Sequence, residues 1–144
     1  MSQRATAESV TLNVTGRVER WGSRLEISHS TANFSGATLA DGVRNLEILV
    51  IGPNSRLTMN GDLTVQTLRF RSGTLDGSGK TTVTRDLTIG DSVAATAMFD
   101  GRDLNVANNV SVTWLGRLIL TNGASFENRT TLEISDLAER IESG

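Results

Sequence analysis

The chain has 144 residues and a formal net charge of −2, with 38% hydrophobic and 21% charged residues. This length suits one domain, and the composition is that of a folded rather than a disordered chain. The basic residues are scattered singly, so nucleic acid is not an expected partner, and the lack of cysteine excludes disulfides, thiolate nucleophiles and cysteine zinc sites.

Residues 1–10 form a polar lead without an apolar stretch of signal-peptide length. No later segment approaches the run of about 20 apolar residues that a membrane span needs, so membrane insertion is not expected. We therefore divide the chain into a polar lead (1–10), a repeat domain (11–134) and a C-terminal cap or linker (135–144).

From Thr11 onward, short pairs of apolar residues enclose one polar residue, and a glycine, serine or asparagine follows each pair within a few positions. This alternation predicts short strands that end in tight turns. Examples in chain order are Leu12/Val14, Leu25/Ile27, Leu46/Ile48, Leu63/Val65, Leu87/Ile89, Leu104/Val106 and Leu132/Ile134.

The leading apolar residues fall into three sets, each with steps of about 20 residues. Such a repeat predicts an all-β fold, a single-stranded parallel β-helix (solenoid) of about six turns with a right-handed coil and an aliphatic interior. The sets are Leu12, Phe34, Leu57, Leu75, Met98 and Leu118; Val18, Leu39, Leu63, Val83, Leu104 and Phe126; and Leu25, Leu46, Leu68, Leu87, Val110 and Leu132.

Residues that follow these inward positions should point outward. Along the third set they are polar and uneven, namely Glu26, Glu47, Arg69, Thr88, Ser111 and Glu133, with Glu47 expected beside Arg69. The first set differs, because Phe99 and Ile119 follow its last two members and predict an apolar contact surface. Trp21, next to Gly22, is a further candidate for this contact surface.

The tail from Ser135 to Glu142 has a capping serine, an acidic first turn and apolar residues four apart, which predicts a short helix. A solenoid has two open ends with unpaired backbone groups, and these ends must be covered. We expect the helix to cap one end, and we expect a protein partner or self-association at the ends.

Two segments resemble the parallel β-helix repeats of filamentous-haemagglutinin-like adhesins and autotransporter passenger regions. They are Gly73–Thr84 with Asp86–Gly90, and Asn122–Asn128 with Thr131–Ile134. The resemblance spans most of the chain. It implies adhesion, spacing or scaffolding in a larger assembly at an extracellular or cell surface, with a glycan as one further kind of partner.

The residues show no convergent catalytic set. His29 is the single histidine and lies in a turn-like stretch, which excludes a two-histidine metal site within one chain. Asp86, Asp91, Asp100 and Asp103 lie near successive turns, as glycosidase or calcium sites on β-helices require, but aspartate is also a favoured turn residue.

We therefore expect a non-enzymatic structural or adhesive module without catalytic residues, cofactor or metal. Two alternatives stay open. One is a carbohydrate-binding or carbohydrate-cleaving β-helix that uses a groove along one face. The other is a cytoplasmic self-assembling scaffold that resembles bactofilins in size.

Overall fold

The structure, a computed structural model, describes residues 4–8, 11–18, 24–39, 45–92, 94–130 and 140–143. All regular elements in these ranges are strands. They are β1 (Arg4–Glu8), β2 (Thr11–Val18), β3 (Arg24–Ser28), β4 (Thr31–Leu39), β5 (Asn45–Ile51), β6 (Arg56–Thr58), β7 (Leu63–Phe70), β8 (Gly73–Asp76), β9 (Lys80–Ile89), β10 (Thr96–Asp100), β11 (Asp103–Val106), β12 (Ser111–Trp114), β13 (Arg117–Thr121), β14 (Phe126–Asn128) and β15 (Arg140–Ser143).

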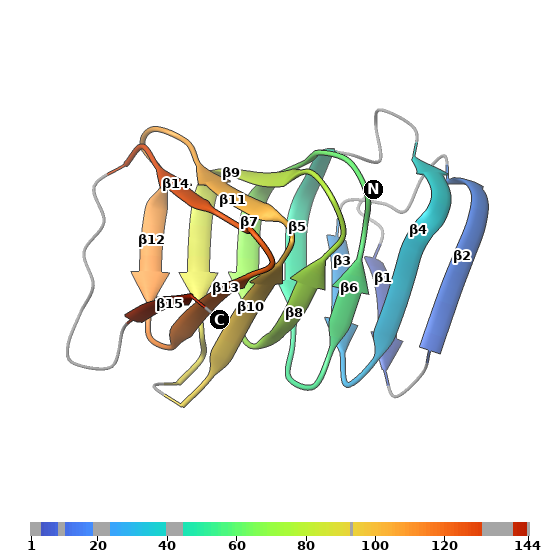
Figure 1. The fold of residues 1–144 in the computed structure, drawn as a ribbon, viewed down its shortest axis with the longest axis horizontal. Helices are drawn as coiled ribbons and strands as arrows, with labels where there is room; N and C mark the ends of the chain where they lie inside the picture. Colours follow the sequence, from blue (N-terminus) through green and yellow to red (C-terminus); the bar gives the residue numbers. More distant parts are fainter. Residues whose placement is uncertain are drawn as a thin grey trace.

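The strands pair in parallel within two sheets, and consecutive strands mostly alternate between the sheets. Sheet A has the order β1-β3-β5-β7-β9-β11-β14, with β12 also paired to β9, and sheet B has the order β15-β13-β10-β8-β6-β4-β2. The chain thus winds as a β-solenoid of about five turns, which is the fold class that the sequence predicts. Figure 1 shows the strands side by side along the long axis, with β2 at one end and β12 at the other.

Sheet A bends in its middle, which produces the three faces expected from the three sets. The long strands β7 and β9 pair along their length with a register irregularity between Val65 and Thr67. In the next turn, separate strands cover the two halves of β9, since β11 pairs with its first half and β12 with its second.

Apolar side chains fill the interior in rows that run from turn to turn. In sheet B, Leu57 registers with Leu75 and Leu75 with Phe99, and all three are fully buried. In the second half of sheet A, Ile51 registers with Phe70 and Phe70 with Ile89. Most of the predicted inward residues are buried, and burial of each such side chain contributes about 1.5–3 kcal/mol before ordering entropy is subtracted.

The rows nevertheless differ in detail from those predicted. Val83 registers with Val65 and Val106, not with Leu63 and Leu104, which instead flank Thr81. On each neighbouring strand, Val83 therefore pairs with the next inward residue, two positions along the chain from the predicted one. The cause is that period-2 alternation gives two equivalent inward positions per strand and does not choose between them.

Polar turn residues and glycines connect the strands, and the turns themselves stack. The Gly61 amide donates to the Ser78 carbonyl at 3.0 Å, and the Lys80 amide donates to the Asp62 carboxylate at 3.1 Å. Gly77 has φ of +98°, and a Cβ built on it would lie 2.1 Å from the Met59 carbonyl oxygen. Only glycine fits there, because turns of adjacent windings approach too closely for a side chain.

The two ends differ from the expected domain limits. Residues 4–8, placed in the polar lead by the sequence, form β1 and pair with β3. At the other end the predicted helix is not formed over residues 140–143, because this segment is β15 and pairs with β13, with Ile141 in register with Leu118. Pairing with an existing sheet edge outweighs a weak local helix signal.

The described residues do not include Leu132, the last inward residue of the third set, or residues 135–139, where the predicted helix begins. The count of about five turns is one lower than predicted. The right-handed coil stays a prediction.

Candidate functional site

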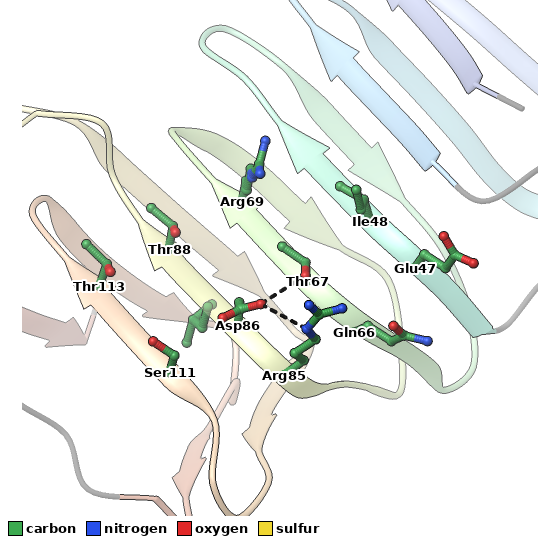
Figure 2. A pocket seen from close by; sticks show the side chains of 11 residues that line it. Glu47, Ile48, Gln66, Thr67, Arg69, Arg85, Asp86, Thr88, Ser111 and Thr113 are labelled. Atoms are coloured by element: carbon green, nitrogen blue, oxygen red, sulfur yellow. Dashed lines mark hydrogen bonds and ion pairs between the residues drawn. The ribbon is translucent and has the colours of Figure 1, made fainter. Parts of the chain in front are cut away.

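The outer face of the second half of sheet A is hollowed, with a cavity volume of about 420 Å³. We call it the sheet A hollow. Its floor consists of two rows that cross the strands, as the registers show: Ile48, Thr67, Asp86 and Ser111 form the middle row, and Arg69, Thr88 and Thr113 form the far row. The rows run along the solenoid axis (Figure 2).

A third group of side chains borders the hollow at the bend of sheet A. Glu47, Gln66 and Arg85 each precede a middle-row residue, on β5, β7 and β9 respectively, and all three are exposed. The irregular register explains this position, because Gln66 and Thr67 are consecutive and lie between the buried Val65 and Leu68, so both face outward. The hollow is therefore lined mostly by polar and charged groups from successive turns.

Of the two carboxylates that line the hollow, Glu47 and Asp86, only Asp86 has side-chain partners among the described residues. Its Oδ2 accepts a hydrogen bond from Thr67 Oγ1 at 3.4 Å and lies 3.5 Å from Arg85 Nε (Figure 2). Both members of the ion pair are well exposed, so the pair contributes little to stability. It does orient Asp86 across the floor of the hollow.

The side chains of Glu47 and Arg69 take part in no hydrogen bond or ion pair with any described residue. The sequence placed them beside each other, but the register puts Val50 next to Arg69 instead. Both charged groups are exposed and available to a ligand.

The four aspartates that the carbohydrate alternative uses are not brought together. Asp86 lines the sheet A hollow, whereas Asp100 ends β10 in sheet B. Asp91 is exposed after β9, and Asp103 accepts a hydrogen bond from the Ser125 amide at 2.8 Å. Asp91 is thus a turn residue and Asp103 begins β11, and these four aspartates do not converge on one site.

Asp100 belongs to a polar cluster on sheet B. Arg56 bridges Asp76 and Asp100, with 3.2 Å between Arg56 Nη2 and the Asp100 carboxylate. A hydrogen bond from Asn122 holds the pKa of Asp100 below its ordinary value, and bonds from Thr121 and Arg56 act in the same direction against the cost of desolvation. This cluster ties neighbouring turns together, although Asp76 Oδ1 is buried without a hydrogen-bond partner.

Among the described residues, no group of three or more histidine, aspartate or glutamate side chains is placed to hold a metal ion. His29 is exposed in a turn with φ of +50°, and its amide donates to the Pro53 carbonyl at 2.9 Å. The turn role predicted for His29 is confirmed. In the same ranges no helix is long and apolar enough to cross a membrane.

The predicted contact surface of Phe99, Ile119 and Trp21 is not assembled. Phe99 is fully buried, and its ring packs against Phe70 with 5.2 Å between centroids. The sequence placed Met98 inward and Phe99 outward, but Phe99 takes the register of Leu75. Ile119 is half-buried beside Met98, and Trp21 lies outside the described residues.

An exposed apolar residue lies instead at the end of sheet B. Leu12 on β2 is 42% exposed, although it belongs to the inward row whose next members, Ala32 and Leu57, are fully buried. β2 is the terminal strand of that sheet. The interior row is thus open at this end.

A second hollow of about 460 Å³ lies over the beginnings of β6, β8 and β10. Its charged residue, Arg56, is already engaged by two carboxylates. The sheet A hollow, with unpaired charges of both signs, is the stronger candidate for ligand binding.

Comparison with protein-family models finds no matching family, and comparisons with curated proteins and with solved structures find no match. Alternation in the sequence predicts that Glu47, Arg69, Thr88 and Ser111 face outward, but it does not predict the hollow that they share. The structural feature behind it is an extra residue on β9, where Thr84 and Arg85 both lie opposite Gln66 of β7.

Proposed function

We propose that this chain is a non-enzymatic structural module whose solenoid associates end to end within a larger assembly. The observation that supports it is the exposure of Leu12 on the terminal strand β2. Each further member of its row in sheet B, from Ala32 to Phe99, is fully covered by the neighbouring turn.

The backbone supports the same proposal. All strand pairs are parallel, so a solenoid added to the outer edge of β2 continues the sheet without a reversal of strand direction. An exposed parallel edge presents unpaired amide and carbonyl groups that favour pairing with another strand. Because such a head-to-tail contact does not close, repeated association gives a linear assembly.

The resemblance to surface β-helix repeats supports an extracellular or cell-surface setting and an adhesive role. A cytoplasmic scaffold is the alternative setting, and it uses the same end-to-end contact. Cell fractionation with an antibody against the chain distinguishes them, since surface protease treatment removes only the extracellular form.

The test of association compares wild type with Leu12→Lys by multi-angle light scattering and electron microscopy. A lysine on the edge strand opposes pairing, so we expect the wild type to form concentration-dependent linear oligomers and Leu12→Lys to stay monomeric. Thr84→Lys, on the exposed face of β9 in the middle of the solenoid, is the control with the same charge change. A wild type that remains monomeric at high concentration contradicts the proposal.

A further inference from the structure

We propose that the sheet A hollow binds an extended acidic polysaccharide that lies along the solenoid axis, with Arg69 contacting an acidic group of the sugar chain. This goes beyond end-to-end association, since it uses the side of the rod and not its ends. It also makes the carbohydrate alternative more specific, because it names the face that binds, the class of ligand, and binding rather than cleavage as the role.

The first argument is the repeat of the floor. Polar side chains recur at each successive strand, as Asp86 and Ser111 do in the middle row and Arg69, Thr88 and Thr113 in the far row. Neighbouring strands are about 4.8 Å apart, which is close to the repeat of an extended β-1,4-linked sugar chain. A ligand with this repeat meets polar side chains on the three successive strands β7, β9 and β12.

The second argument is the chemistry of the lining. Thr88, Ser111 and Thr113 offer hydroxyl groups that donate and accept hydrogen bonds. Glu47 and Asp86 accept hydrogen bonds from sugar hydroxyls. Arg69 is an exposed cation without a partner among the described residues, and its planar guanidinium suits a carboxylate.

The third argument concerns size and preorganisation. The cavity volume of about 420 Å³ lies within the range of small-molecule sites. The floor consists of paired strands, and Asp86 is oriented by Thr67 and Arg85 (Figure 2). Less ordering is therefore needed on binding than for a site on loops.

Other extended polymers fit less well. A peptide strand repeats at about 3.3 Å per residue and binds chiefly to free strand edges, whereas most of the hollow lies over β5, β7 and β9, which are paired on both sides. Single-stranded nucleic acid fits less well because its bases stack on aromatic side chains, and none lines the hollow.

The experiment measures binding of two ligands by isothermal titration calorimetry. They are a β-1,4-linked mannuronate oligomer and the matching neutral β-1,4-mannan oligomer, which differ in the carboxylate on each ring. We expect the acidic oligomer to bind more tightly than the neutral one, and Arg69→Gln to weaken acidic binding about tenfold, or about 1.4 kcal/mol.

Arg71→Gln is the matched control, because Arg71 is exposed close in sequence but does not line the hollow. It should leave binding unchanged. Thr113→Tyr obstructs one end of the far row with a residue that favours strands, and should weaken both ligands. Thermal melts verify that each variant is folded.

Three results overturn the proposal: no binding of the acidic oligomer, equal binding of the neutral oligomer, or an equal loss of affinity in Arg71→Gln and Arg69→Gln. The last result indicates a general charge effect. None of these results bears on end-to-end association, because Leu12 and β2 lie outside the lining of the hollow.

Discussion

Replacement of the buried Arg102 by methionine should strongly destabilise the solenoid. Arg102 is 0% exposed, and its Nε donates to Thr81 Oγ1 at 2.8 Å. Its Nη1 donates to the carbonyls of Met59 at 2.9 Å and Ser78 at 2.6 Å, and its Nη2 donates to the Lys80 carbonyl at 3.1 Å. One side chain thus joins backbone groups of preceding turns.

The magnitude follows from the groups left behind. Methionine keeps the length of the apolar stem but donates no hydrogen bond, and each buried acceptor that loses its donor costs about 1–3 kcal/mol. Relief of the buried positive charge offsets part of this cost. We expect a net loss of about 3–5 kcal/mol in the free energy of unfolding, and a fall in Tm of about 10–15 °C for a domain of this size.

Urea denaturation followed by far-UV circular dichroism measures this loss, and a thermal scan measures Tm. Arg71→Met is the control, because the Arg71 side chain is exposed and makes no hydrogen bond or ion pair in the described ranges, so its replacement should change stability by less than about 0.5 kcal/mol. If Arg102→Met is as stable as the wild type, apolar packing outweighs the lost hydrogen bonds and the reasoning is wrong.

Three further predictions concern the turns, the core and the polar cluster. Gly77→Ala should cost more than about 2 kcal/mol in urea denaturation, because alanine is strained at φ of +98° and its Cβ meets the Met59 carbonyl oxygen; an unchanged midpoint contradicts this close stacking. Phe99→Ala should cost about 3–5 kcal/mol by calorimetry, because the ring is fully buried, whereas an unchanged Tm would support the outward position that the sequence suggested. Asn122→Ala should raise the pKa of Asp100 towards its ordinary value of 3.8, measured by NMR titration of the carboxyl carbon. Because the folded-state pKa of Asp100 is depressed, the stability that its carboxylate contributes is present above the ordinary pKa and is lost as pH falls through the depressed value. Identical titrations of Asp100 in the wild type and the variant would refute the role of Asn122.

Several features of the fold could be predicted because they depend on short segments. Alternation such as Leu63/Val65 identifies strands, and Trp114, which continues the alternation of Val110 and Val112, is only 1% exposed. Its ring packs against Phe126 with 5.8 Å between centroids. The repeat of about 20 residues then predicts stacking of like units.

Prediction was wrong where adjacent residues are both apolar. Met98 and Phe99 are consecutive, so alternation alone permits either to face inward, and only pairing with Leu75 places Phe99 in the core. The helix predicted for the C-terminal tail is wrong for a related reason. The apolar spacing of the tail suits a helix, but an available edge on β13 makes residues 140–143 a strand.

The candidate site was predicted only in part. The outward orientation of Arg69, Thr88 and Ser111 follows from alternation, and the structure adds that all three line the sheet A hollow. The neighbours of Arg69 could not be predicted, because they depend on the register between β5 and β7. The same holds for Arg102, whose acceptors lie in other turns.

The amino-acid sequence by itself determined the all-β class, the short strands, the glycine turns and the stacked repeat, since each arises from residues that are near neighbours in the chain. Tertiary structure alone decided which inward position each strand uses, where sheet A bends, and that Leu12 stays exposed at an end. The physical reason is that register depends on pairing between residues about 20 positions apart, where packing and backbone hydrogen bonds of whole turns select among alignments that the local pattern leaves equivalent.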